Sequence, residues 1–242
     1  MGAKKIKGAR KDVFRDEEVL TSLQKMHTWM ERNPFHVAGV AAATVFALAL
    51  VWGINSYGEA KERKAQSAYA EISAKLSARD RQETTDWEKL IPELEAFIKD
   101  HHGTISAADA QLDLCLAYAQ TKHYEEVIKT CNEVVKAGDA PPDVKSLARY
   151  RLATTYETMG KSDDAINLWN ILGREDPEWF GREADWHQAR LYCEKHEFTK
   201  AVEEYENSIK ASGMYPSSTL LQEELASAKL KSITSQNSKS DK

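Results

Sequence analysis

The sequence lacks the patterns that mark most catalytic and nucleic-acid-binding proteins. Its 38 acidic residues outnumber its 33 basic residues, so the chain has no overall basic charge to attract a phosphate backbone. It contains no glycine-rich phosphate-binding loop and no serine on a Gly-x-Ser-x-Gly turn. We therefore expect no nucleic-acid partner, no cofactor and no catalytic residue.

Candidate metal ligands are also sparse. His101 and His102 precede Gly103 in a predicted polar turn, and Cys193 and His196 lie near a predicted helix end. We interpret both pairs as parts of turns and predict no metal site. A metal- or thiol-dependent redox protein that uses Cys193 and His196 is the alternative from another functional class.

Cysteine occurs only three times, so at least one cysteine is unpaired within the chain. Cys115 and Cys131 fall on two helices that we predict to be antiparallel, and an oxidising compartment would allow a bond between them. We favour buried free thiols at small core positions. The spacing leaves both states open.

No segment alternates apolar and polar residues for long enough to require a β-sheet, and the chain after residue 57 has the pattern of helix pairs joined by short polar turns. A tyrosine recurs at nearly constant spacing in this part of the chain. Tyr118, Tyr156 and Tyr192 are separated by 38 and 36 residues. This spacing is near the period of about 34 residues in the tetratricopeptide repeat, the TPR. The excess fits proline-containing turns at 138–143 and around Pro177. The predicted fold class is all-α, with a TPR-like α-solenoid of helix pairs.

Small and large residues alternate within these repeats in a way that explains helix packing. Small side chains permit close approach of paired helices, and aromatic side chains fill the gaps between neighbouring pairs. The small positions are Ala153, Ala165, Ala189 and Ala201, and the large ones are Tyr156, Trp169, Tyr192 and Tyr205. The recurring stretch is therefore predicted to be a scaffold.

One long uncharged run interrupts an otherwise charged sequence. Val37 to Ile54 spans 18 residues without a charged side chain, near the lower end of the roughly 17–25 residues that cross a bilayer as a helix. Aromatic residues lie near both ends of the run, where a membrane interface favours them. We predict a single transmembrane helix over residues 35–57, in preference to a cleaved signal peptide or a buried core helix.

Charge is distributed unevenly about this run. Eight basic and five acidic residues precede residue 57, so this part has a net charge of +3. Because the whole chain has a net charge of −5, the rest of the chain carries −8. The basic head predicts a cytoplasmic N-terminus, although the basic residues nearest the run favour the opposite orientation. Gly39, Ala43 and Ala47 recur every four residues, and this small face either packs against another membrane helix or belongs to a plain alanine-rich helix.

The segment before the span is predicted to be cytoplasmic. Residues 1–34 comprise a basic tail and an amphipathic helix with Asp16 as N-cap and Pro34 as stop. The apolar stripe of this helix consists of Val19, Leu23, Met26 and Met30.

The TPR-like domain is predicted to cover residues 58–233. A degenerate helix pair, at about 59–78 and 87–103, precedes the regular units. A capping helix from Pro216 to Ile233 closes the array, with Ser217 or Ser218 as N-cap. Residues 234–242 have the composition of a disordered tail.

The concave face of a TPR array is built by the first helix of each pair and offers an extended surface to protein partners. The side chains that we place on this face are Leu112, Leu116, Tyr150, Thr154, Trp186 and Arg190. They do not reproduce the lysines and asparagines with which some TPRs clamp the carboxylate tails of cytosolic chaperones. We expect extended or amphipathic protein segments as ligands.

The layout as a whole resembles a known family. The segment DEEVLTSLQKMHTWMERNP, a single apolar run ending in LVWGINSYGEAKERKAQSAYAEI, degenerate TPRs and a closing helix follow one another between about Asp16 and Ile233. This order is similar to the bacterial inner-membrane TPR proteins typified by the ancillary subunit of the SecYEG translocon. The longer basic head and the three cysteines depart from that pattern.

The resemblance implies a non-catalytic membrane-anchored adaptor at the bacterial inner membrane. It implies a cytoplasmic N-terminus, a periplasmic TPR domain, and partners among translocon subunits, periplasmic chaperones and emerging secretory chains. A cell-envelope assembly or division scaffold of the same architecture is the alternative.

Overall fold

The computed structural model describes residues 24–77, 86–138 and 140–240. Within these ranges the chain is helical apart from short turns, and none of the described residues forms a β-strand. The predicted all-α class is confirmed. The chain divides into two compact units, Met1–Ala60 and Lys61–Lys242.

In the first unit, a helical segment over residues 24–32 ends before Asn33, and α2 (Pro34–Ser77) begins directly after it. Pro34 thus begins a helix, because the missing N–H of proline is tolerated in a first turn. Met26 and Met30 of the predicted apolar stripe are 54% and 37% exposed. Asp16, Val19 and Leu23 lie outside the described residues.

The uncharged stretch of α2 exposes its apolar side chains. Phe35, Phe46 and Trp52 are 89%, 66% and 73% exposed. Among the described residues, one helix is long and apolar enough to cross a membrane, and it is this one. The same helix continues to Ser77, so the apolar run and the first helix of the second unit are one uninterrupted element.

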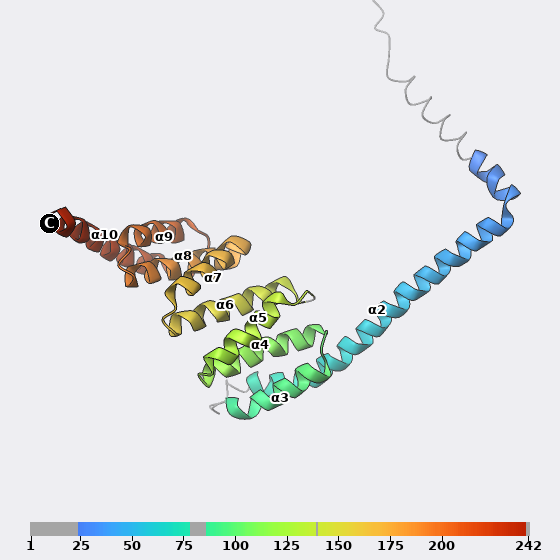
Figure 1. The fold of residues 1–242 in the computed structure, drawn as a ribbon, viewed down its shortest axis with the longest axis horizontal. Coiled ribbons are helices and arrows are strands. Elements are labelled where there is room, and N and C mark those ends of the chain that lie inside the picture. Colours follow the sequence, from blue (N-terminus) through green and yellow to red (C-terminus); the bar gives the residue numbers. More distant parts are fainter. Residues whose placement is uncertain (1–23, 78–85, 139, 241–242) are drawn as a thin grey trace, which may run out of the picture. The chain divides into compact units, whose positions relative to one another are not determined.

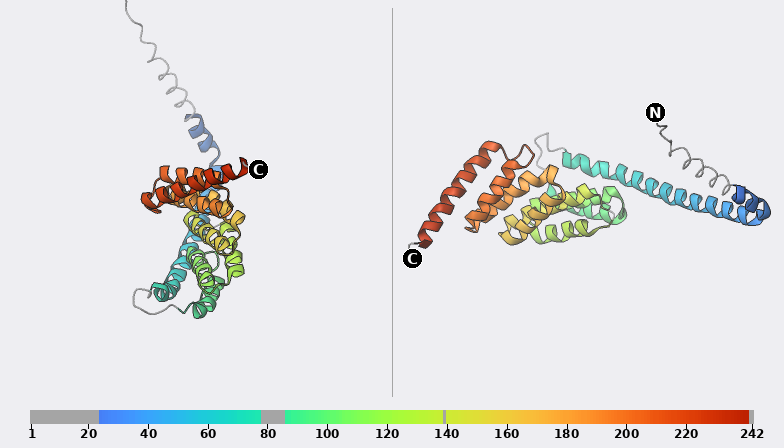
Figure 2. Two further views of the ribbon diagram at one scale, coloured as in Figure 1. Left: turned by 90° about the vertical axis from the view of Figure 1, so that its left-hand side faces the viewer. Right: turned by 90° about the horizontal axis from the view of Figure 1, so that it is seen from above.

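The second unit stacks its helices in sequence order (Figure 1). After the last turns of α2 come α3 (Trp87–Asp100), α4 (Ile105–Gln120), α5 (Tyr124–Lys136), α6 (Pro142–Thr158), α7 (Ser162–Glu175), α8 (Pro177–Glu194), α9 (Phe198–Lys210) and α10 (Ser218–Ser240). Figure 2 shows the same succession from two further directions. This arrangement is the predicted solenoid of helix pairs.

The recurring tyrosines also shape the turns within the pairs. In three helix pairs the carbonyl of the recurring tyrosine accepts a 2.8 Å hydrogen bond from the backbone N–H five residues later. The donors are His123 to Tyr118, Lys161 to Tyr156 and Glu197 to Tyr192. The residue before each donor has a positive φ, at Lys122, Gly160 and His196. A left-handed residue stops a helix in this way. His196 therefore occupies the same turn position as Gly160 and lies in a turn, as predicted from the sequence.

Four small cores follow one another along the second unit, and each is enclosed by three consecutive helices. The first lies between α2, α3 and α4, the next between α4, α5 and α6, the third between α6, α7 and α8, and the last between α8, α9 and α10. Ala153, Ala165, Ala189 and Ala201 are all 0% exposed. Stacking therefore buries a face that each pair would leave exposed.

A buried arginine holds the closing helix. Arg182 on α8 is 7% exposed, and its guanidinium donates to the carbonyls of Pro216 at 2.9 Å and Ala211 at 3.2 Å and to Ser218 Oγ at 3.0 Å. A buried cation requires such acceptors. The turn between α9 and α10 is thereby fixed to α8.

α10 differs in length from the predicted capping helix. Ser217 Oγ accepts a hydrogen bond from Leu220 N at 3.3 Å, which agrees with the predicted N-cap. The helix continues past Ile233 to Ser240, where the composition predicted a disordered tail. Residues 234–240 contain neither proline nor glycine, so no residue in this stretch stops the helix.

Candidate protein-binding groove

A cavity of about 390 Å³ opens on the side of the second unit formed by the first helices of three pairs. Its lining comes from α4, α6 and α8, and comprises Leu112, Asp113, Leu116, Leu147, Tyr150, Arg151, Phe180 and Glu183. We call this set the groove. Five of the eight side chains are apolar or aromatic, so the groove can bury apolar side chains of a ligand.

The structure brings together three of the six predicted groove residues. Leu112, Leu116 and Tyr150 line the cavity, whereas Thr154, Trp186 and Arg190 do not. Thr154 lies one turn beyond Tyr150 on α6, and its hydroxyl donates to the Tyr150 carbonyl at 3.1 Å.

Trp186 lies in the core between α8, α9 and α10 and is only 7% exposed. Its indole N–H donates to Glu224 Oε2 on α10 at 2.7 Å, and its ring meets Tyr215 edge-on at 5.4 Å. The Arg190 guanidinium lies 4.8 Å from the Trp186 ring centre. The closing helix thus covers the surface that Trp186 would otherwise present.

Five lining residues were not in the predicted set, namely Asp113, Leu147, Arg151, Phe180 and Glu183. Arg151 is the sequence neighbour of the predicted Tyr150. Leu147 and Tyr150 are three residues apart on α6, and Phe180 and Glu183 have the same spacing on α8. Such spacing places each pair on one helix face. The helical period was therefore a usable signal for Leu147, once the face had been anchored at Tyr150.

A polar network extends from the groove into the third core. The Tyr150 hydroxyl donates to Glu183 Oε1 at 3.0 Å. His187 lies one turn further along α8, with its Nε2 3.8 Å from Glu183 Oε1 and its Nδ1 2.8 Å from Glu157 Oε1 on α6. Glu157 also accepts from the indole N–H of Trp169, whose ring stacks on His187 at 4.1 Å. Three helices thus meet at one imidazole.

The carboxylates of this network shift the pKa values of His187 and Tyr150. Burial acts to lower the pKa of His187, but hydrogen bonds to Glu157 and Glu183 and the charges of both outweigh burial and raise that pKa. Burial, together with the Glu183 charge, raises the pKa of Tyr150 to about 12. The groove tyrosine therefore stays a neutral hydrogen-bond donor at physiological pH.

Asp113 connects the groove to the first helix of the array. Its carboxylate accepts a hydrogen bond from the Tyr69 hydroxyl of α2. Burial raises the pKa of Asp113, and the Tyr69 hydrogen bond and the Arg151 charge counteract only part of that effect. Arg151 is therefore the cation that partly compensates this carboxylate.

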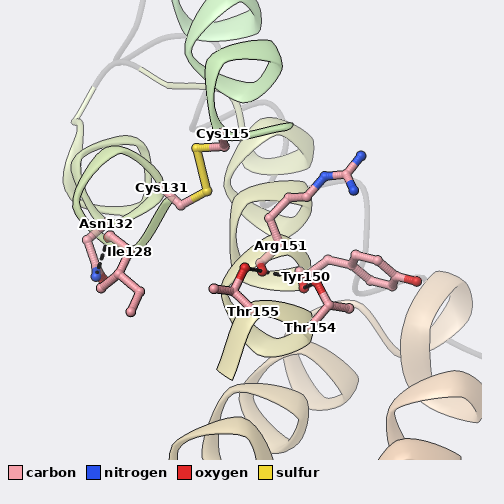
Figure 3. Close-up of a disulfide and its surroundings, with 8 residues drawn as sticks. All are labelled: Cys115, Ile128, Cys131, Asn132, Tyr150, Arg151, Thr154 and Thr155. Atoms are coloured by element: carbon pink, nitrogen blue, oxygen red, sulfur yellow. Dashed lines mark hydrogen bonds between the residues drawn. A yellow bond between two sulfur atoms is a disulfide. The ribbon is translucent and has the colours of Figure 1, made fainter. Parts of the chain in front are cut away.

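The structure joins Cys115 and Cys131 in a disulfide between α4 and α5, with Cα atoms 6.0 Å apart (Figure 3). This differs from the free thiols that we favoured from the sequence. Both positions face each other across one antiparallel pair and are 0% exposed, so the two small side chains meet in the core. Figure 3 also shows the side chains of Tyr150 and Arg151 extending away from Asn132.

The remaining predicted sites lie elsewhere. Gly39, Ala43 and Ala47 occupy successive turns of α2 and are exposed, and a Cβ added at Gly39 would meet no atom within 4 Å. Within the described ranges, no group of three or more His, Cys, Asp or Glu side chains is arranged to hold a metal ion. Cys193 is a half-buried free thiol, and burial raises its pKa.

Comparison with known proteins identifies the repeat. The family described as tetratricopeptide repeat-like domain matches residues 28–235. One similar solved structure is a crystal structure of a single-residue variant of a putative kinesin light chain from Podosopora anserina with nearly identical TPR-like repeats. Its sequence is 20% identical and its TM-score is 0.54. The match covers 72% of this chain and 91% of that chain. A TPR protein from Parabacteroides merdae has 15% identity and a TM-score of 0.53, over 67% of this chain and 60% of that chain.

At these identities the solved structures show a shared fold alone. A comparison with curated proteins finds no match to this sequence. TPR-like repeats are typically non-catalytic scaffolds for protein–protein interaction.

Proposed function

The chain belongs to the family of tetratricopeptide repeat-like proteins, and we propose that it is a membrane-anchored adaptor of the bacterial inner membrane that captures protein partners in its groove. One observation carries this proposal. A single helix, α2, contains both an exposed apolar run and the first helix of the repeat array. The proposed membrane anchor and the first helix of the repeat array thus belong to one helix.

The composition and exposure of α2 support the anchor. All of its apolar side chains from Phe35 to Tyr57 except Val37 are exposed, and exposure of such a surface to water is unfavourable. We assign residues 1–34 to the cytoplasm, 35–57 to the bilayer and 58–233 to the repeat domain. Along the face of Gly39, Ala43 and Ala47 we propose that the span packs against a partner's helix.

Charge and cysteine chemistry support a periplasmic repeat domain. The net charge of +3 before residue 57 favours retention of the head in the cytoplasm, whereas the remainder carries −8. The Cys115–Cys131 disulfide lies within the repeat domain, and disulfides persist in the periplasm but are rare in the cytoplasm.

The resemblance to the ancillary translocon subunit supports a specific set of partners. We propose that the adaptor links the Sec translocon to periplasmic chaperones or to emerging secretory chains. A membrane tether raises the local concentration of a linked site to about the millimolar range, so that weak groove contacts suffice. No catalytic step is required of such a protein.

Photocrosslinking in native membranes tests the proposal. A photoreactive residue replaces Leu147, which is 47% exposed within the groove, and a matched variant carries it at the exposed Glu203 on α9. We expect translocon subunits or periplasmic chaperones to be captured from position 147 and not from position 203.

Other captures would overturn parts of the proposal. Cytoplasmic proteins alone would reverse the topology. Proteins of envelope assembly or division would keep the anchored adaptor and remove the translocon link.

A further inference from the structure

The groove carries more negative than positive charge. Asp113, Arg151 and Glu183 belong to its lining. Asp109 lies one turn before Asp113 on α4, and Asp143, in the first turn of α6, is close enough to raise the pKa of Asp109. The lining thus contains two carboxylates and one guanidinium, and Asp109 and Asp143 add two carboxylates on the same helices α4 and α6 outside the lining.

Asp109 shows that this negative charge is not compensated locally. Burial raises its pKa first, and the charges of Asp113, Asp143 and Glu62 raise it further. A neighbouring cation would act to lower this pKa, and the charges that act on Asp109 are those of carboxylates. Within the described part of the chain, no ion pair joins Asp109 to a lysine or arginine.

The one guanidinium of the lining is already engaged. Arg151 acts on Asp113, whose carboxylate is also bonded to Tyr69. Glu183 is occupied by the Tyr150 hydroxyl and faces His187. The groove therefore offers acceptors for a further cation but presents little positive charge to an anion.

The apolar side of the groove lies beside these carboxylates. Leu112 and Leu116 come from the same helix as Asp109 and Asp113, and Leu147 from the helix that carries Asp143 in its first turn. A ligand that fits both features needs apolar side chains together with ammonium or guanidinium groups.

We propose that the groove selects basic apolar protein segments, in which lysine or arginine side chains flank the apolar residues that enter the cavity. This inference rests on the proposed function of the groove and adds the chemical class of its partner. Opposite charges attract over about 10 Å at ordinary ionic strength, whereas the carboxylates of the groove would repel an acidic segment.

Binding of three designed peptides tests the selectivity. The full chain is placed in nanodiscs of phosphatidylcholine, which has no net charge, and empty nanodiscs correct for lipid binding. The fluorescent peptides share leucines and serines at fixed positions and differ only in whether the remaining positions hold lysine, glutamine or glutamate. Fluorescence anisotropy reports the affinity.

We expect the lysine peptide to bind at least about tenfold more tightly than the glutamate peptide at roughly 50 mM salt, and the difference to shrink at about 500 mM salt. Asp109→Asn should weaken the lysine peptide by about two- to fivefold, as the loss of one partly exposed charge partner does. Asp164→Asn removes the same charge from an exposed site on α7 and should have no such effect. Because Asp109 is repelled by its neighbours, its replacement is not expected to unfold the protein.

The outcomes separate this inference from the proposed function. If all three peptides bind equally and Tyr150→Ala abolishes binding, the groove captures apolar segments and the charge preference is wrong. If the lysine peptide binds equally well to the Asp109→Asn and Tyr150→Ala variants, it binds outside the groove and the inference fails. Absence of binding by all three peptides would also overturn the inference about charge selectivity. The proposed adaptor function would still be tested separately by photocrosslinking.

Discussion

At the scale of single residues, Asp185 links the stability of the array to pH. Burial, together with the nearby Glu204 of α9, raises the pKa of Asp185 to about 7. The folded protein keeps this proton where the unfolded chain has released it, so the contribution of Asp185 to folding falls as the pH rises from about 4 to about 7. We expect Asp185→Asn to leave the free energy of unfolding nearly unchanged near pH 4 and to raise it by about 1–2 kcal/mol near pH 8, after allowance for its partial exposure.

Chemical denaturation at both pH values measures this difference. Asp164→Asn serves as the control, because its carboxyl is exposed. The raised pKa of His187 means that the stabilising charge of His187 is present at low pH and lost at higher pH. The parent and both variants share this loss, so it cancels when their free energies of unfolding are compared at the same pH. An equal gain for Asp185→Asn at both pH values would show that packing, and not the proton, is responsible.

At the scale of elements, the Cys115–Cys131 disulfide ties α4 to α5. It closes a loop with a sequence separation of 16 residues, and a loop of this length is worth about 3 kcal/mol through the lost freedom of the unfolded chain. We expect reduction to lower the free energy of unfolding by about 2–3 kcal/mol, measured by denaturation with and without a thiol reductant.

Two variants give this prediction its controls. Cys193→Ser alters the free thiol and should keep the full sensitivity to reductant. Replacement of both Cys115 and Cys131 by serine should remove the sensitivity. A parent protein whose stability does not respond to reductant would contradict the role of the disulfide.

At the scale of the whole molecule, we propose that the exposed apolar run of α2 anchors the repeat domain to a membrane. Phe46 lies near the middle of this run and is 66% exposed. An arginine at the centre of a spanning helix costs about 2.5–3.5 kcal/mol on insertion scales. We expect Phe46→Arg to shift much of the protein from carbonate-washed membranes to the soluble fraction, while Phe46→Leu stays with the membrane. Unchanged fractionation of the arginine variant would argue against a bilayer-spanning role.

The repeat frame and the apolar run were predictable because both depend on short stretches of sequence. Tyr118, Tyr156 and Tyr192 recur at nearly constant spacing, and the structure gives all three the same turn hydrogen bond. The turn at His196 was predicted as well, whereas its positive φ is a finding of the structure. Helical periodicity and the length of an uncharged run are local properties, so the sequence reports them directly.

The composition of the groove was decided by tertiary structure. Trp186 has the spacing of a groove residue, yet α10 covers it, because Arg182 fixes the preceding turn to α8. Phe180 and Glu183 reach the cavity because both lie against Tyr150 of α6, a contact that no local pattern encodes. The same holds for the meeting of Cys115 with Cys131 and for the crowding of Asp109 by Asp143.

The sequence by itself thus determined the helical class, the repeat and the apolar run, since propensity, periodicity and transfer free energy act over a few residues at a time. Only the packed array decided which side chains share a cavity and which carboxylates stand together, because those distances depend on how helices far apart in the chain settle against one another.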